Sequence, residues 1–169
     1  MCACTGGDSA GGNLTAATLL LTHQRKGAAI AFQLLLYPAV HAGAKNKSRE
    51  EFAVGYALDK TLSNWMWSNY VGSHDGNDPL ISPWLAEDLS FMPPAFVLTA
   101  SHDPLRDEAK LYADRLQKEG VKCEYKCYQG MLHGFLNHTY LLPLDVGEEA
   151  ISACAKHLRN ALQASAGKL

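Results

Sequence analysis

The segment Gly7–Gly11 is a G-x-S-x-G pentapeptide that lies between a short apolar run and a long helical pattern. Small residues on both sides of a serine allow a sharp turn from strand to helix, and this turn presents the hydroxyl to a substrate. The pattern predicts that Ser9 is a nucleophile. Because the same string also arises by chance in glycine-rich loops, the assignment depends on whether the chain supplies a base and an acid.

A candidate acid and a candidate base each follow an apolar run. A serine hydroxyl needs a base that accepts its proton, and the base needs a carboxylate that orients it. Asp103 follows the apolar run of residues 95–100, and His133 follows residues 123–128 and a short loop. Loops at the carboxyl ends of parallel strands form the ligand crevice of an open sheet. We therefore expect Ser9, Asp103 and His133 to assemble as a triad.

Strands and helices alternate in the pattern that positions these side chains, which predicts an α/β fold with a parallel sheet. Residues 32–37 are almost continuously apolar, as expected of a strand that is covered on both faces. Apolar residues at helical spacing predict a helix over residues 10–26, with Leu14, Ala17, Thr18 and Leu21 on one face, and another from residue 105 to Gly120. Asp107, one turn after Asp103, is a rival acid that we assign to stabilising a helix start. The four expected strands are residues 2–6, 32–37, 95–100 and 121–128.

Composition excludes several classes of function. The chain has 169 residues, 47% of them hydrophobic, and a net charge of -2 without a basic stripe, so we expect no nucleic-acid partner. It contains no apolar run of the roughly 20 residues that a membrane-spanning helix needs. Its five cysteines are an odd number, and Cys123 and Cys127 would lie about 13 Å apart on a strand. We expect reduced thiols and a cytoplasmic location.

Three segments that contain these candidates resemble the signatures of the hormone-sensitive-lipase-like carboxylesterases, which have the α/β-hydrolase fold. They are GDSAGGNL at 7–14, DPLRDE at 103–108 and GMLHGF at 130–135, and LISPWLAEDL at 80–89 resembles the lead-in to the strand before the acid. The resemblance implies that Ser9 is the nucleophile, Asp103 the acid and His133 the base. It also implies that the backbone N–H of Ala10 donates to the oxyanion.

Residues 41–79 interrupt the alternation of strands and helices, and the resemblance implies that they are part of a cap over the mouth of the active site. A helical pattern with an apolar side lies within this insertion. Aromatic residues at helical spacing either pack in a core or line a pocket, and both interpretations stay open. The candidate substrate contacts are Trp65 and Trp67 in the insertion, and Leu105 and Phe135 beside the acid and the base.

The chain departs from the family at its start, because it begins only eight residues before Ser9. The family carries an H-G-G-G loop and further strands before the nucleophile, so we expect a partial α/β-hydrolase fold with about four parallel strands and a partial cap over residues 1–169. The first strand would then have a bare edge, which favours self-association. Loss of oxyanion donors from the missing loop would lower activity.

The resemblance implies a serine carboxylesterase that hydrolyses short to medium acyl esters through an acyl-enzyme. It implies no metal and no cofactor, and a small-molecule ester as the binding partner. Two alternatives stay open: an inactive fragment of an esterase, and a relative that binds a small molecule without catalysis.

Overall fold

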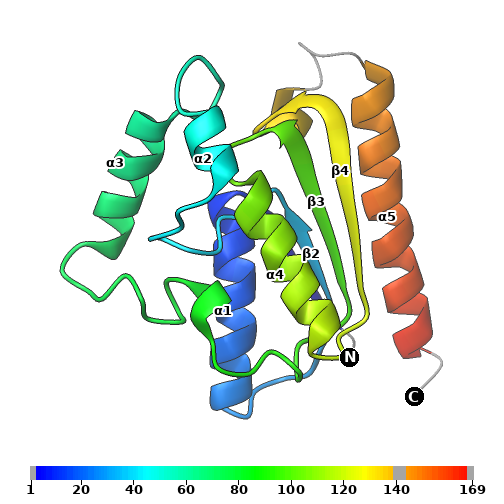
Figure 1. Cartoon of the computed structure of the whole chain (residues 1–169). Helices are drawn as coiled ribbons and strands as arrows, with labels where there is room; N and C mark the ends of the chain where they lie inside the picture. The colour runs from blue at the N-terminus through cyan, green and yellow to red at the C-terminus, as the bar shows by residue number, and fades with distance from the viewer. Residues whose placement is uncertain (1–2, 139–143, 167–169) are drawn as a thin grey trace.

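A four-stranded parallel sheet with helices on both faces forms the centre of the molecule (Figure 1). The computed structural model describes residues 3–138 and 144–166. The strands lie side by side in chain order, so each new strand is added at the same edge. They are β1 (Ala3–Asp8), β2 (Ile30–Leu36), β3 (Ala95–His102) and β4 (Cys123–Leu132).

Three helices cover the sheet. Helices α1 (Ala10–Gln24) and α4 (Arg106–Lys118) pack on one face, and α5 (Leu144–Ala166) packs on the other (Figure 1). Each face of the sheet has its own hydrophobic core, and side chains that alternate along the central strands belong to one core or the other. Leu35 and Val97 pack with α1 and α4, whereas Leu34, Phe96 and Leu98 pack with α5. The continuous apolar runs of β2 and β3 arise because both of their faces are covered.

The predicted α/β class and the four parallel strands are confirmed, with shifted boundaries. The first strand was expected at residues 2–6. It extends to Asp8 and so ends directly before Ser9, while residue 2 lies outside the described part of the chain. Strand β1 is an edge strand of the described sheet and pairs there with β2. Self-association through this edge stays a prediction.

The buried face of α1 differs from the predicted one. Leu14 is 54% exposed, and the helix buries the side that carries Asn13, Ala16, Leu19 and Leu20. The buried side carries small and polar residues over its first half and Leu19 and Leu20 in its second half, so the spacing of large apolar residues does not identify it. The second expected helix is present as α4, and its Ala109, Tyr112 and Leu116 are fully buried.

The segment between β2 and β3 carries the remaining helices. Helix α2 (Lys47–Glu51) and helix α3 (Lys60–Val71) begin at Asn46 and Asp59, whose side chains accept from backbone N–H groups of the first turn. A short 3-10 turn, η1 (Pro83–Leu85), leads back to β3, and η2 (Phe135–His138) follows β4. Helix α3 stands at the side of the α1 layer, and α2 lies near the N-terminal end of α4 (Figure 1).

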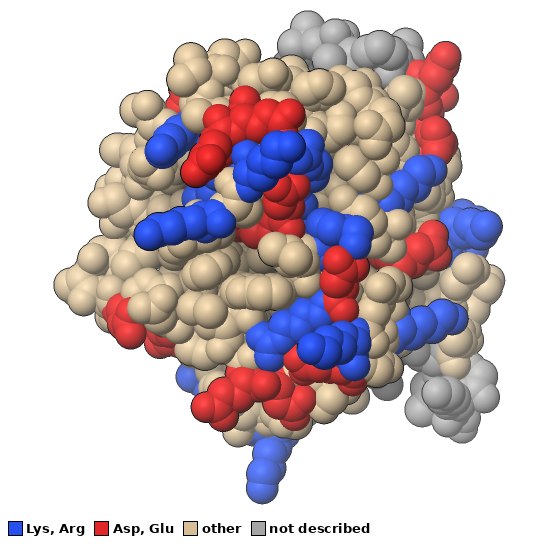
Figure 2. Space-filling view, in the orientation of Figure 1, with Lys and Arg blue, Asp and Glu red and all other residues tan. Residues whose placement is uncertain are grey.

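Acidic and basic side chains alternate on the face seen in Figure 2, which shows no stripe of a single sign. Arg115 of α4 binds the carbonyl groups of Trp84, Ala86 and Glu87 and pairs with Glu119. Among the described residues, no helix is both long enough and apolar enough to cross a bilayer.

Candidate active site

Ser9 lies on a strained turn between β1 and α1. Its backbone has φ 53° and ψ -116°, a left-handed conformation that non-glycine residues rarely adopt. The N–H of Ser9 donates to the carbonyl of Leu36 over 2.9 Å, which fixes the turn to the end of β2. A Cβ at Gly7 would lie 2.4 Å from the backbone of Gly11, and one at Gly12 would lie 2.6 Å from Pro38. The spacing of the small residues is therefore a steric requirement of this turn.

The three predicted triad residues form a continuous chain of hydrogen bonds. Nε2 of His133 lies 2.8 Å from Oγ of Ser9, and Nδ1 of His133 lies 2.8 Å from Oδ2 of Asp103. The residues follow β1, β3 and β4 directly, so they meet at the carboxyl edge of the sheet. This arrangement can pass the serine proton to the imidazole while the carboxylate holds the other ring nitrogen.

Asp103 is completely buried and its carboxylate has two partners. Oδ2 binds His133, and Oδ1 accepts the N–H of Leu105 over 2.8 Å. Asp107 has a different role. Its Oδ2 accepts the N–H of Ser48 over 2.8 Å and its Oδ1 accepts from Arg106 over 2.9 Å, so it fastens α2 to the first turn of α4.

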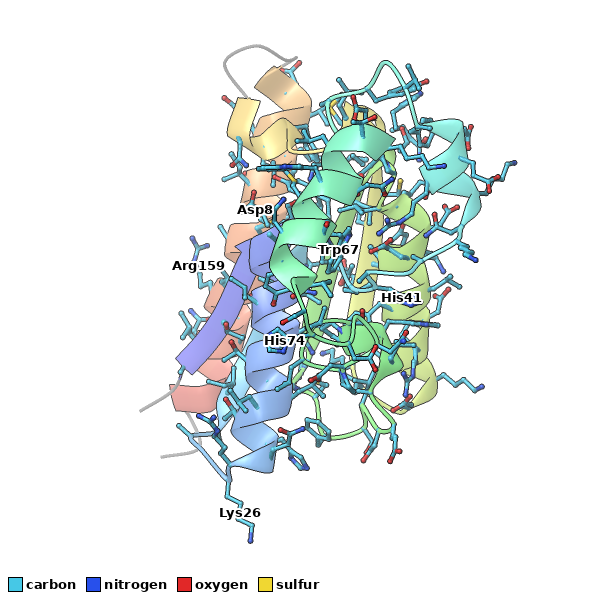
Figure 3. All side chains as sticks on the ribbon, turned by 90° about the vertical axis from the view of Figure 1, so that its left-hand side faces the viewer. Asp8, Lys26, His41, Trp67, His74 and Arg159 are labelled. Carbon is cyan, nitrogen blue, oxygen red and sulfur yellow. The ribbon has the colours of Figure 1, made fainter. Side chains whose placement is uncertain are left out.

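An apolar cavity of about 360 Å³ opens beside Ser9. Helix α3 forms one wall with Ser63, Met66, Trp67 and Tyr70, which share one side of the helix. Figure 3 looks onto this helix, with Asp8 at the end of β1 on one side and His41 beside α4 on the other. The other residues that line the cavity are Ser9, Ala10, Asn13, Leu14, Ala39, Leu58 and Leu105.

The structure separates the four predicted substrate contacts into two pairs. Trp67 and Leu105 line the cavity. Trp65 is 64% exposed and lies outside the lining, because it is two residues from Trp67 and therefore on another side of α3. Phe135 is buried against Tyr37 and Tyr128, in the core under α5. Trp65 and Phe135 thus lie outside the lining of this cavity, whereas Trp67 and Leu105 stay predicted substrate contacts.

Asn13 joins the segments around the cavity, and the sequence analysis did not assign it a role. Its Nδ2 donates to the carbonyl groups of Ala39 over 2.9 Å and Ile81 over 2.8 Å. Its Oδ1 accepts from the hydroxyl of Tyr70 over 3.2 Å. An amide on the core-facing side of a helix is the signal that could have identified it, because a buried amide needs partners for all of its polar atoms.

A buried ion pair joins α2 and α4 to the segment after β2. Glu108 is 4% exposed, and its carboxylate binds Arg49 over 2.7 Å and accepts the N–H of Val40 over 3.0 Å. Arg49 also donates to the carbonyl of His41 over 3.1 Å. Burial raises the pKa of Glu108, and the Arg49 charge opposes that rise. The pair fastens α2 and the segment after β2 to α4.

Comparisons with known proteins agree with this geometry. A family model described as alpha/beta hydrolase fold matches residues 3–137. The carboxylic ester hydrolase LipN of Mycobacterium tuberculosis is 38% identical over 164 residues, which cover 90% of this chain and 43% of that protein. The chain spans about half the length, or less, of the curated relatives it matches.

Two solved structures are also similar. A hyperthermophilic esterase from Pyrobaculum calidifontis superposes with a TM-score of 0.86 at 40% identity, over 92% of this chain and 51% of that one. An ester hydrolase from the metagenome of Lake Arreo, solved with a bipyridine phosphonate derivative, gives a TM-score of 0.80 at 40% identity. That match covers 90% of this chain and 50% of the other.

Proposed function

We propose that this chain, which belongs to the alpha/beta hydrolase fold family, hydrolyses carboxylic esters through an acyl-enzyme on Ser9. The hydrogen-bond chain from Ser9 through His133 to Asp103 carries the proposal, with both distances at 2.8 Å. Relatives named as carboxylic ester hydrolases and carboxylesterases support the reaction class.

Acylation of Ser9 is the first half of the proposed reaction. Oγ of Ser9 attacks the ester carbonyl carbon while its proton moves to Nε2 of His133. The tetrahedral intermediate collapses, the bond to the alcohol oxygen breaks, and His133 returns the proton to the leaving alcohol. Asp103 holds Nδ1–H and stabilises the charged imidazole.

Deacylation repeats these steps with water. His133 accepts a proton from the water molecule, the resulting hydroxide attacks the acyl carbon, and Ser9 leaves with its proton restored. The acid product and the free enzyme result.

The oxyanion of each intermediate needs donors that are already in place. Ala10 is the first residue of α1, where a backbone N–H has no partner inside the helix. Ala10 also lines the cavity beside Ser9. We assign its N–H as one oxyanion donor, supported by the favourable field at the start of a helix.

The cavity favours uncharged acyl groups, because apolar side chains from α3, Leu58 and Leu105 form most of its lining. Its volume of about 360 Å³ suits a short to medium acyl chain. We therefore propose Trp67 and Leu105 as substrate contacts.

Hydrolysis of 4-nitrophenyl butyrate tests the function directly. Ser9→Ala and His133→Ala should each lower kcat by at least about 10³-fold, and Asp103→Asn by a similar factor, because the members of a triad act as a unit. Ser73→Ala, at an exposed serine away from the cavity, is the matched control and should retain the wild-type rate. Equal rates in wild type and Ser9→Ala would reject the proposal.

A further inference from the structure

We propose that Tyr37 is a positioning residue whose ring holds the imidazole of His133 in the orientation that joins Asp103 to Ser9. This inference rests on the proposed function, since it assigns a role within the same site. It concerns a side chain that lies at the end of β2 and not in the substrate cavity.

The first observation is the contact between the two rings. The ring centroids of Tyr37 and His133 lie 5.1 Å apart with an interplanar angle of 64°, an edge-type arrangement that aromatic rings favour. Phe135 lies on Tyr37 with centroids 6.0 Å apart, and Tyr37 is completely buried. A ring that is itself fixed in a core offers the imidazole a rigid neighbour.

The second observation is the backbone of Tyr37. It has φ 37°, in the left-handed region that glycine adopts at far lower cost than a tyrosine. Its N–H donates to the carbonyl of Leu98 on β3 over 2.6 Å. The preceding residue, Leu36, accepts the N–H of Ser9 over 2.9 Å.

These contacts place Tyr37 between all three strands that carry the triad. Its backbone binds β3, which leads to Asp103, its neighbour binds Ser9 after β1, and its ring contacts His133 after β4. Leu36 and Tyr37 together therefore connect the three strand ends that carry the triad.

The ring has a specific task during the reaction. The hydrogen bond from Ser9 to His133 is broken when Ser9 becomes acylated, so only Asp103 then holds the imidazole by a hydrogen bond. The contact with Tyr37 does not involve the reacting atoms and persists through every step. It keeps the plane of the imidazole fixed and keeps water from the bond between Nδ1 and Asp103.

A spectroscopic signature tests this role without turnover. The proton on Nδ1 of His133, shared with a buried carboxylate, should give a resolved NMR resonance far downfield of the backbone amides. His133→Gln, which should lack this resonance, provides its assignment. In Tyr37→Leu we expect the resonance to broaden or disappear because the proton exchanges faster with water.

Two further variants separate positioning from general stability. Tyr37→Phe retains the ring and should restore the resonance that Tyr37→Leu loses. Tyr112→Leu removes an equally buried tyrosine from the core between α4 and the sheet, far from His133. It should lower the unfolding midpoint but keep the resonance.

Kinetics of the same variants complete the test. Tyr37→Leu should lower kcat by about 10²-fold, as expected for a small displacement of a catalytic group, with KM little changed. A Tyr37→Leu protein that keeps both the sharp resonance and its kcat would overturn the proposal, as would loss of the resonance in Tyr112→Leu. If wild type shows the resonance but no ester turnover, the proposed function fails while the positioning role is still decided by the NMR comparison.

Discussion

The hydroxyl of Tyr70 donates a hydrogen bond of 3.2 Å to Oδ1 of Asn13, across 57 residues of chain. This bond joins α3 to the helix that starts at the nucleophile turn. Because the amide nitrogen of Asn13 also binds Ala39 and Ile81, one side chain connects four segments around the cavity. The shape of the cavity therefore depends on a buried polar group at its edge.

Replacing Asn13 by alanine should lower the free energy of unfolding by about 2 to 3 kcal/mol, because the buried carbonyl of Ala39 and the partly buried carbonyl of Ile81 lose their donor. Urea unfolding followed by circular dichroism measures the change. Asn69→Ala is the control, since the bond from its side chain to the carbonyl of Trp65 is on the exposed surface of α3, and it should change stability by less than about 0.5 kcal/mol. Equal effects of the two substitutions would show that the Asn13 contacts do not hold the fold.

Tyr70→Phe should raise KM for 4-nitrophenyl butyrate by up to about fivefold, because loss of one hydrogen bond of about 1 kcal/mol loosens the α3 wall. The value of kcat should change by less than about twofold, since the hydroxyl of Tyr70 binds Asn13 in the cavity wall and not a member of the triad. Steady-state kinetics separate the two constants. Tyr56→Phe, whose ring packs on Phe52, should behave as wild type. A fall in kcat with unchanged KM would be incompatible with a role in the cavity wall.

The sequence was sufficient to predict the groups at the strand ends. Ser9, Asp103 and His133 each follow an apolar run, and parallel strands bring such positions to one edge of a sheet. The resulting geometry depends on strand order, which here is the chain order.

Residues that act through long-range polar contacts could not be predicted in the same way. Glu108 looks like a charged residue in the first turn of a helix, yet it is buried because α2 brings Arg49 against it. Trp65 and Trp67 are equally apolar, and only the rotation of α3 relative to the sheet decides that Trp67 faces the cavity. These outcomes depend on the packing of the insertion, for which periodicity carries no information.

Glu108→Ala should lower the free energy of unfolding by about 3 to 5 kcal/mol, because it leaves the half-buried Arg49 charge without its partner. Thermal and urea unfolding report the change. Glu51→Ala removes an exposed partner of Arg106 and should cost less than about 1 kcal/mol. A loss for Glu108→Ala no larger than that for Glu51→Ala would contradict the assigned role of the buried pair.

Stability should fall as the pH drops below the usual histidine range, in part because of His41. Burial and then the Arg49 charge lower the pKa of His41 in the folded protein. The unfolded chain therefore binds protons that folded His41 does not, so unfolding becomes easier as pH falls through about 6.5 and below.

His41→Gln should reduce the difference between urea midpoints measured at about pH 7.5 and about pH 5.5, because the variant has no imidazole to protonate on unfolding. His74→Gln is the control, since His74 lies exposed after α3 (Figure 3), and it should keep the wild-type pH dependence. A larger pH dependence in His41→Gln would show that folding does not lower the pKa of His41.

The mass of the protein trapped during turnover shows whether Ser9 carries the acyl group. Wild-type chain mixed with excess 4-nitrophenyl butyrate and quenched in acid should carry one butyryl group, and peptide analysis should locate it on Ser9. In His133→Ala the adduct should form far more slowly, because the serine proton has no acceptor at the 2.8 Å position. Ester hydrolysis without an adduct on Ser9, or an adduct on another residue that forms equally fast in Ser9→Ala, would contradict the account.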